Sequence, residues 1–147
     1  MSRMTIPAAL RTGFALLAFL GLAGSLPLGA HHSFAAEFDD QKPVRMTGTL
    51  VKVEWQNPHI WFYLAVKNPD GTSTTWGFAG GAPGQLMRRG ITKDLLKIGD
   101  TIVVEGFRAK DGSCNASGGR ITFTDGRNVL TAGAQDRVPP QMTQNKQ

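Results

Sequence analysis

The sequence predicts a small, mostly β protein: an OB-fold-like barrel of five to six strands with one short helix between strands three and four. Three observations favour this class. Short segments of alternating apolar and polar residues recur between turn signals, and a helix-like segment follows the third of them. The apolar phase of the first strand also switches part-way along, as in a strand that coils sharply. A generic small β-sandwich fits the regular short strands as well.

The first thirty residues have the composition of a secretory signal peptide. A head that carries Arg3 and Arg11 and no acid is followed by an apolar run, FALLAFLGLAG, and then by the small residue Ala30. The run is shorter than the roughly 20 residues that a membrane-spanning helix needs. We therefore expect residues 1–30 to be removed on export, and the mature protein to be periplasmic or secreted, with no membrane insertion after cleavage.

The mature chain would keep 14 basic and 11 acidic residues, a net charge of +3. This charge is too small to predict a nucleic acid partner. The one cysteine, Cys114, excludes an intrachain disulfide. Because its surroundings, KDGSCNASGG, are polar and rich in glycine, we interpret it as a thiol in a loop, with no assigned role.

The mature chain is expected to begin with an extended segment, residues 31–43, pinned by Phe34 and Phe38. The segment HHSFAAEFDDQKP shows no strand alternation. We place the barrel over residues 44–132. The tail over residues 133–147 is polar and contains proline, so we expect it to be disordered.

The first strand, VRMTGTLVKVEWQ, covers residues 44–56 and changes its apolar phase. The first apolar phase consists of Val44, Met46 and Leu50. The second consists of Val51, Val53 and Trp55. The switch comes just after Gly48, where glycine relaxes the backbone. The pattern predicts a bulge that lets one long strand serve two sheets.

The second strand, HIWFYLAVK, follows an Asn-Pro turn and has two distinct faces. Its core face is formed by Ile60, Phe62, Leu64 and Val66, and its other face by His59, Trp61 and Tyr63. The turn NPDG then leads into a returning strand over residues 73–79.

A short helix is expected after the third strand, with Pro83 in its first turn and Gly90 as its cap. Arg88 and Arg89 lie in its last turn, where they complement the helix dipole. The segment TKDLL adds a second helical turn. Further strands are expected over residues 99–110 and 119–124 and in RNVLTA.

Several motifs occur together in an order that resembles a known family. They are HHSFAAEFD, GTLVKVEWQNPH, WGF, LMRRGITKDLLKIGD and AKDGS. This string is similar to an exported bacterial family known as domain of unknown function 6152. The resemblance implies one exported domain and no particular activity. The family pattern has an acidic residue after W-x-F, where this chain has Ala79, so no role that needs a carboxylate at that position is expected here.

We do not expect an enzyme. The acidic residues are scattered, and three of the aspartates, Asp70, Asp111 and Asp125, lie in expected turns. The sequence contains no G-x-S-x-G, HExxH or phosphate-binding loop. General acid–base catalysis needs a histidine or a tuned carboxylate within reach of a partner, and no such pair stands out.

The histidines suggest a metal site, with copper as the expected ion. Cleavage after Ala30 would make His31 the first residue, whose amine and imidazole could chelate Cu(II) with His32 or His59 as a further ligand. Cleavage one residue earlier would give AHH, which also wraps Cu(II) through its nitrogens. The alternative is that His31 and His32 form a polar end and that His59 holds its turn through a hydrogen bond.

The second hypothesis is a binding module for a carbohydrate, peptide or protein partner of the cell envelope. Trp61 and Tyr63 share the outer face of the second strand, and we expect Trp76 or Phe78 of the third strand to lie beside them. Such aromatic surfaces stack on rings of ligands. The N-terminal segment could instead cover this face, which would carry His31 and His32 towards His59.

Overall fold

The computed structural model describes residues 34–134 and 136–142, which belong to one compact unit over residues 32–147. The expected signal peptide, His31 and His32 lie outside the described residues. The described helices are short: α2 (Phe34–Glu37), α3 (Pro83–Arg88) and the 3-10 helix η1 (Lys93–Leu95). The seven described strands are β1 (Phe38–Glu54), β2 (Trp61–Lys67), β3 (Ser73–Ala79), β4 (Thr101–Ala109), β5 (Asn115–Ser117), β6 (Arg120–Phe123) and β7 (Asn128–Leu130).

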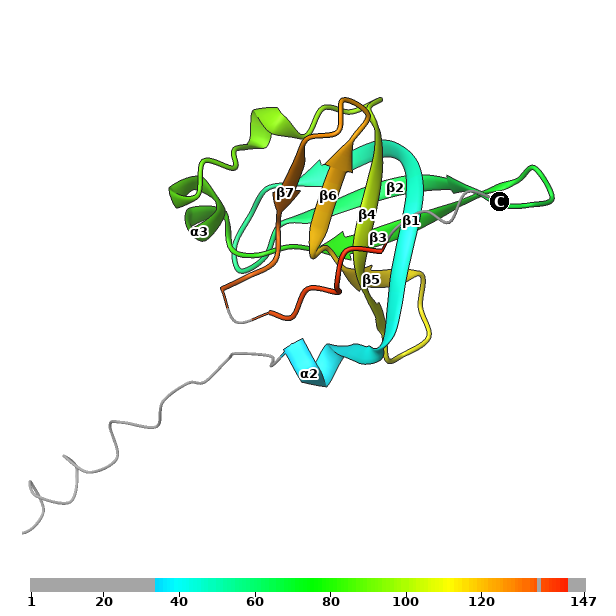
Figure 1. The fold of residues 1–147 in the computed structure, drawn as a ribbon, viewed down its shortest axis with the longest axis horizontal. Coiled ribbons are helices and arrows are strands. Elements are labelled where there is room, and N and C mark those ends of the chain that lie inside the picture. The colour runs from blue at the N-terminus through cyan, green and yellow to red at the C-terminus, as the bar shows by residue number, and fades with distance from the viewer. Residues whose placement is uncertain (1–33, 135, 143–147) are drawn as a thin grey trace, which may run out of the picture. The chain divides into compact units, whose positions relative to one another are not determined.

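Five strands close a barrel in the order β1–β2–β3–β5–β4, because β1 also pairs with β4. Neighbouring strands are antiparallel except β3 and β5, which are parallel. Helices α3 and η1 lie in the connection between β3 and β4, and Figure 1 shows them at the side of the barrel. This arrangement confirms the mostly β, OB-fold-like class.

Strand β1 coils as its phase switch predicts. It pairs with β4 through residues 43–49 and with β2 through residues 49–54, and a bulge lies between Leu50 and Lys52. The bulge turns Val51 outward, where 43% of it is exposed. Gly48 is needed because a Cβ there would lie 2.7 Å from the carbonyl oxygen of Ala65. One strand thus serves both halves of the barrel.

The fifth barrel strand differs from the expected one. The sequence predicts that the segment of β5 belongs to the polar loop around Cys114 and that the next strand covers residues 119–124. In the structure β5 pairs with both β3 and β4, whereas β6 pairs with β4 and β7. Three residues are too few to show an alternation, although Ala116 at the centre of β5 is fully buried. Cys114, exposed just before β5, lies in the connecting loop.

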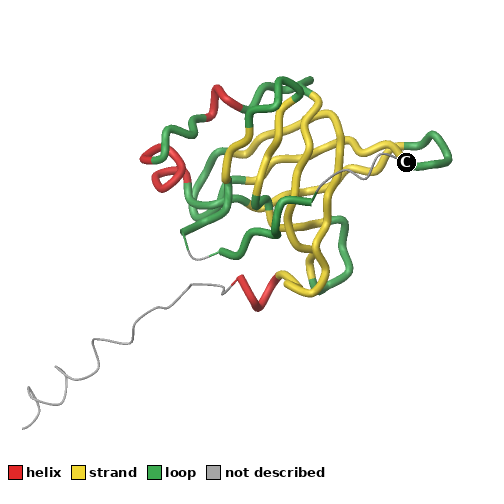
Figure 2. The backbone as a smooth tube through the Cα atoms, viewed as in Figure 1, coloured by secondary structure: helices red, strands yellow, loops and turns green. Residues whose placement is uncertain are grey.

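The core is built from inward-facing apolar side chains of the barrel strands and of the α3–η1 connection. Its fully buried members include Leu50, Ile60, Phe62, Leu64, Phe78, Leu86, Val104 and Ile121. Phe62 and Phe78 stack with ring centroids 5.6 Å apart. Figure 2 shows the strands forming the body of the domain, with the helices outside it.

The N-terminal segment is pinned to the barrel by its phenylalanines, as the sequence predicts. The Phe34 ring lies 5.4 Å from Phe38 and 5.9 Å from Phe107 between centroids. Phe38 and Phe107 are buried in a small cluster with Ala109, outside the main core. The segment is not extended throughout, because residues 34–37 form the helical turn α2 before β1 begins.

Part of the C-terminal segment, predicted as a disordered tail, packs against the barrel. Pro139 is fully buried, and the amide of Met142 donates a 3.0 Å hydrogen bond to the Glu105 carboxylate. Arg137 forms an ion pair with Asp40 of β1. In the part of the chain that the structure describes, no helix is both long and apolar enough to cross a membrane.

Candidate aromatic binding site

Trp61 and Tyr63 point outward from β2, because they alternate with the buried Phe62 and Leu64. Their ring centroids are 6.4 Å apart and the ring planes differ by 24°. Both side chains are half-buried. Two adjacent, nearly parallel rings therefore form an open aromatic surface on the outside of the barrel.

Gly77 of β3 provides the space that these rings occupy. The strand register places Lys52, Tyr63, Gly77 and Asn115 in one row across β1, β2, β3 and β5. A Cβ on Gly77 would lie 3.2 Å from Tyr63 Cε1, 3.4 Å from Trp61 Cζ3 and 2.6 Å from Asn115 Oδ1. The rings thus lean over a position that has no side chain.

Polar groups from β1 surround the tyrosine. The Tyr63 hydroxyl donates a 2.7 Å hydrogen bond to Glu54 Oε2, and Lys52 Nζ lies 2.7 Å from Glu54 Oε1. The Lys52 ammonium also lies 5.1 Å from the centre of the Tyr63 ring. Hydrogen bonds from Lys52 and then Tyr63 lower the pKa of Glu54, while burial and then Glu54 raise the pKa of Tyr63.

A cavity of about 300 Å³ lies at the tryptophan end of this surface. Trp61 forms one side; the rest is lined by Ala36, Glu37, Phe38, Ala109, Lys110, Asp111 and Asn115. Lys110 ties α2 to the end of β4, because its Nζ donates to Ala35 O at 2.6 Å and its amide to Glu37 O at 2.9 Å. The N-terminal segment therefore forms a wall of the cavity and leaves Trp61 and Tyr63 partly exposed.

Trp76 does not join Trp61 and Tyr63. Its register partner is Leu64, so it shares the inward phase of β2 and packs against the main core. The Arg108 guanidinium lies 5.4 Å from the centre of its ring. Phe78 is the register partner of Phe62 and is fully buried. The expectation that Trp76 or Phe78 lies beside the other two rings is therefore not met, since cross-strand partners point to the same side of a sheet.

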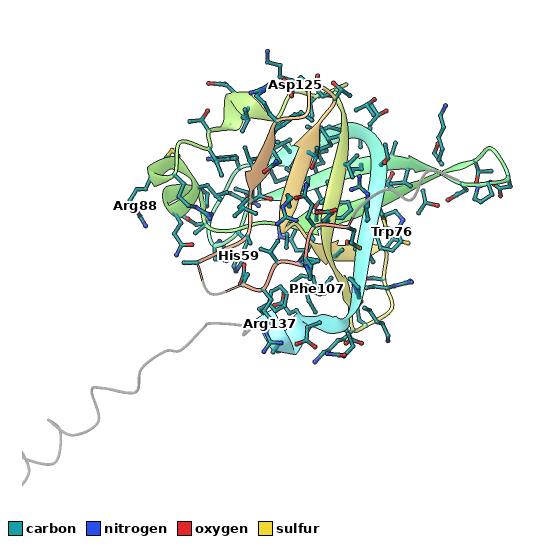
Figure 3. All side chains as sticks on the ribbon, viewed as in Figure 1. His59, Trp76, Arg88, Phe107, Asp125 and Arg137 are labelled. Carbon is teal, nitrogen blue, oxygen red and sulfur yellow. The ribbon has the colours of Figure 1, made fainter. Side chains whose placement is uncertain are left out.

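His59 lies in the turn before β2 and is exposed. Its Nδ1 lies 3.0 Å from the carbonyl oxygen of Gly80, which is the turn-holding hydrogen bond proposed for it from sequence. When Nδ1 donates this bond, Nε2 carries the lone pair. Figure 3 shows His59 and Trp76 on well separated parts of the barrel. The described residues contain no group of three or more His, Cys, Asp or Glu side chains that could hold a metal ion.

The fold and the site define a class: a five-stranded OB-like barrel with an outward aromatic pair beside the β4–β5 loop. OB-folds use the face of strands two and three and the adjoining loops to bind oligonucleotides and oligosaccharides. The model of the family of unknown function DUF6152 matches residues 21–119, and the chain belongs to this family. The matched region contains all five barrel strands, and β6 and β7 follow it. The search of curated proteins gave no match.

Proposed function

We propose that this protein is a binding module whose aromatic surface, formed by Trp61 and Tyr63, holds a carbohydrate chain. The pair of outward rings, 6.4 Å apart and nearly parallel, is the observation that carries the proposal. Aromatic rings offer large flat apolar surfaces to the C–H faces of sugars. Glu54 and Asn115 provide carboxylate and amide groups beside the rings for sugar hydroxyls.

The surroundings of the rings favour a carbohydrate over a peptide strand. Strand β2 is paired with β1 on one side and β3 on the other, so it has no open edge to which a peptide could add. A ligand would therefore meet side chains, mainly aromatic and polar ones, and not a free strand edge.

The charges favour a neutral ligand over a nucleic acid. Lys52 is paired with Glu54, and Lys110 donates to a backbone carbonyl. The acidic Glu37 and Asp111 line the cavity as well. Because nucleic acid binding depends on basic groups that neutralise phosphates, these pairings disfavour it.

The proposal is tested with the mature chain, residues 31–147, on an array of neutral and anionic oligosaccharides, followed by calorimetry. We expect a neutral oligosaccharide to bind and Trp61→Ala to weaken binding about fivefold, since a ring contact contributes of order 1 kcal/mol. Leu130→Ala, which shortens an exposed side chain on β7, is the control and should bind normally. The proposal is wrong if no neutral sugar binds or if Trp61→Ala binds as tightly as the native chain.

A second candidate function, Cu(II) binding, is favoured by the hydrogen bond of His59. Metal-ligating histidines usually donate their other ring nitrogen to a carboxylate or a backbone carbonyl, as His59 can to Gly80. In this proposal His59 Nε2 joins the amine and imidazole of His31, or the imidazole of His32, around one ion.

Calorimetry with Cu(II) tests this second candidate. We expect one ion per mature chain, with weaker binding for His59→Ala and a collapse of affinity when one extra residue precedes His31. Equal affinities for the native and the extended N-termini would rule the arrangement out.

A further inference from the structure

The connection between β3 and β4 concentrates the positive charge of the domain. Residues 83–98 carry four basic side chains and one acidic side chain. All other described residues together carry nine basic and ten acidic side chains. The net positive charge of the described domain therefore resides in this one segment.

Three of these cations have no partner among the residues that the structure describes. Among the basic side chains of the described residues, those without an ion pair, hydrogen bond or ring contact are Lys67, Arg88, Lys93 and Lys97. Arg89 differs, because it donates a 2.6 Å hydrogen bond to the carbonyl of Ala132. Figure 3 shows the Arg88 side chain pointing away from the barrel. We call Met87, Arg88, Lys93, Lys97 and Ile98 the basic edge.

The basic edge also carries the most exposed large apolar side chains of the described residues. Ile98 is 61% exposed and Met87 55%. A cavity of about 330 Å³ next to Ile98 has Val53 and Leu96 in its wall and Lys93, Asp94 and Lys97 around it. Exposed apolar groups surrounded by polar ones are typical of interaction surfaces.

We propose that the basic edge docks this protein on an anionic membrane surface. Unpaired Arg88, Lys93 and Lys97 would meet lipid phosphates, while Ile98 and Met87 enter the boundary between headgroups and acyl chains. Clustered cations interspersed with apolar side chains are how peripheral proteins bind such surfaces. Figure 1 shows α3 and the turn that follows it on a different side of the barrel from α2, which borders the aromatic surface.

The exposed apolar side chains of the basic edge distinguish a membrane from a nucleic acid as the partner. A nucleic acid would use the three cations but would leave Ile98 and Met87 in water. Two apolar side chains exposed by more than half beside unpaired cations favour a partner that has an apolar layer beneath its charges.

Vesicle co-sedimentation of the chain from residue 31 onward tests the proposal. This chain is used because the apolar leader would itself bind vesicles, and because both clusters of buried apolar residues lie within residues 38–132. We expect binding to vesicles that contain phosphatidylglycerol, weakened by salt, and little binding to phosphatidylcholine alone.

The variants separate a docking surface from a general effect of charge. The triple variant Arg88→Gln, Lys93→Gln, Lys97→Gln should bind at least about tenfold more weakly, since each cation near an anionic surface contributes about fivefold. The matched control Lys42→Gln, Lys67→Gln, Arg127→Gln removes the same charge elsewhere and should change binding less than about twofold. Ile98→Ser should weaken binding severalfold at unchanged charge. Equal binding to both vesicle types, binding to neither, or an equal loss in the control would overturn the proposal.

Discussion

The Tyr63 hydroxyl donates a 2.7 Å hydrogen bond to Glu54 and so links the aromatic surface to β1. Lys52 forms an ion pair with the other oxygen of the same carboxylate. The three side chains lie on adjacent strands, because Lys52 and Tyr63 are register partners and Glu54 is opposite Trp61. The position of the Tyr63 ring and the charges of Glu54 and Lys52 therefore depend on one another at the candidate site.

The first prediction concerns the pKa of Glu54. Lys52 and Tyr63 both lower it from its ordinary value of 4.5. Tyr63→Phe should raise it towards that value, and Lys52→Gln should raise it further, because Lys52 is the larger cause. Because the pKa is lowered in the folded state, the carboxylate stabilises the fold above pH 4.5, and this contribution disappears as the pH falls through the lowered pKa.

Carbon-detected NMR titration of Glu54 in the native chain and both variants measures this effect. Asp70→Asn serves as the control, because Asp70 lies in the turn that follows the far end of β2, whereas Glu54 is opposite Trp61 at the start of that strand. A Glu54 pKa that is the same in the native chain and in Lys52→Gln would contradict the assigned cause.

The second prediction concerns the wall formed by α2. Phe34→Ala removes ring contacts to Phe38 and Phe107. Each aromatic pair contributes about 0.5–1.5 kcal/mol, so the loss of unfolding free energy should be about 1–3 kcal/mol. Urea unfolding measures it, and hydrogen exchange should accelerate at residues 35–38. Unchanged exchange there would show that Phe34 does not hold the segment.

The alternation of apolar and polar residues predicted features of the fold that lie within one strand of four or more residues. The period of two in β2 was sufficient to identify its core side and to place Trp61 and Tyr63 on the other side. The switch in β1 predicted the bulge because a bulge reverses which side chains face inward. Each of these signals lies within a single strand.

Features that depend on register or on distant segments could not be predicted in this way. The side on which Trp76 lies follows from its pairing with Leu64, and the register of a hairpin depends on its turn. Gly77 and Asn115 join the site only because β5 closes the barrel beside β3. The one local signal for this part of the site was Gly77 itself, between Trp76 and Phe78. A glycine inside a strand often marks a place where another group approaches the backbone closely.

The third prediction concerns Gly106 of β4. A Cβ there would lie 1.7 Å from the carbonyl oxygen of Ser117, a backbone atom that cannot rotate away. Gly106→Ala should prevent closure of the barrel, with a loss of more than about 4 kcal/mol or no folded protein.

Gly84→Ala in α3 is the matched control for Gly106. Its Cβ would meet only the end of Arg88, at 3.7 Å, so the change should be neutral or stabilise by up to about 1 kcal/mol. Thermal unfolding of both variants compares them. Equal stabilities would mean that β4 and Ser117 are not in close contact.

The fourth prediction concerns Glu105 on the outer side of β4, whose side chain is only 2% exposed. Its two oxygens lie 3.1 Å from Arg45 Nη1 and 2.8 Å from Arg120 Nη1. The Met142 amide donates to the same carboxylate, so the C-terminal segment is fastened to it. Glu105→Gln leaves two partly buried guanidinium groups without a counter-charge, and loss of one partner of a buried ion pair typically costs about 3–5 kcal/mol.

We expect Glu105→Gln to lower the unfolding free energy by about 3 kcal/mol and to speed hydrogen exchange at Met142. Glu54→Gln is the control, because it removes the same charge from an exposed pair, where solvent screening makes the loss much smaller. Urea unfolding compares the two variants with the native chain. Protected exchange at Met142 in Glu105→Gln would mean that the buried Pro139, not the carboxylate, holds the C-terminal segment on the barrel. Faster exchange there together with the larger loss would identify Glu105 as the group that joins β1, β4, β6 and the C-terminal segment.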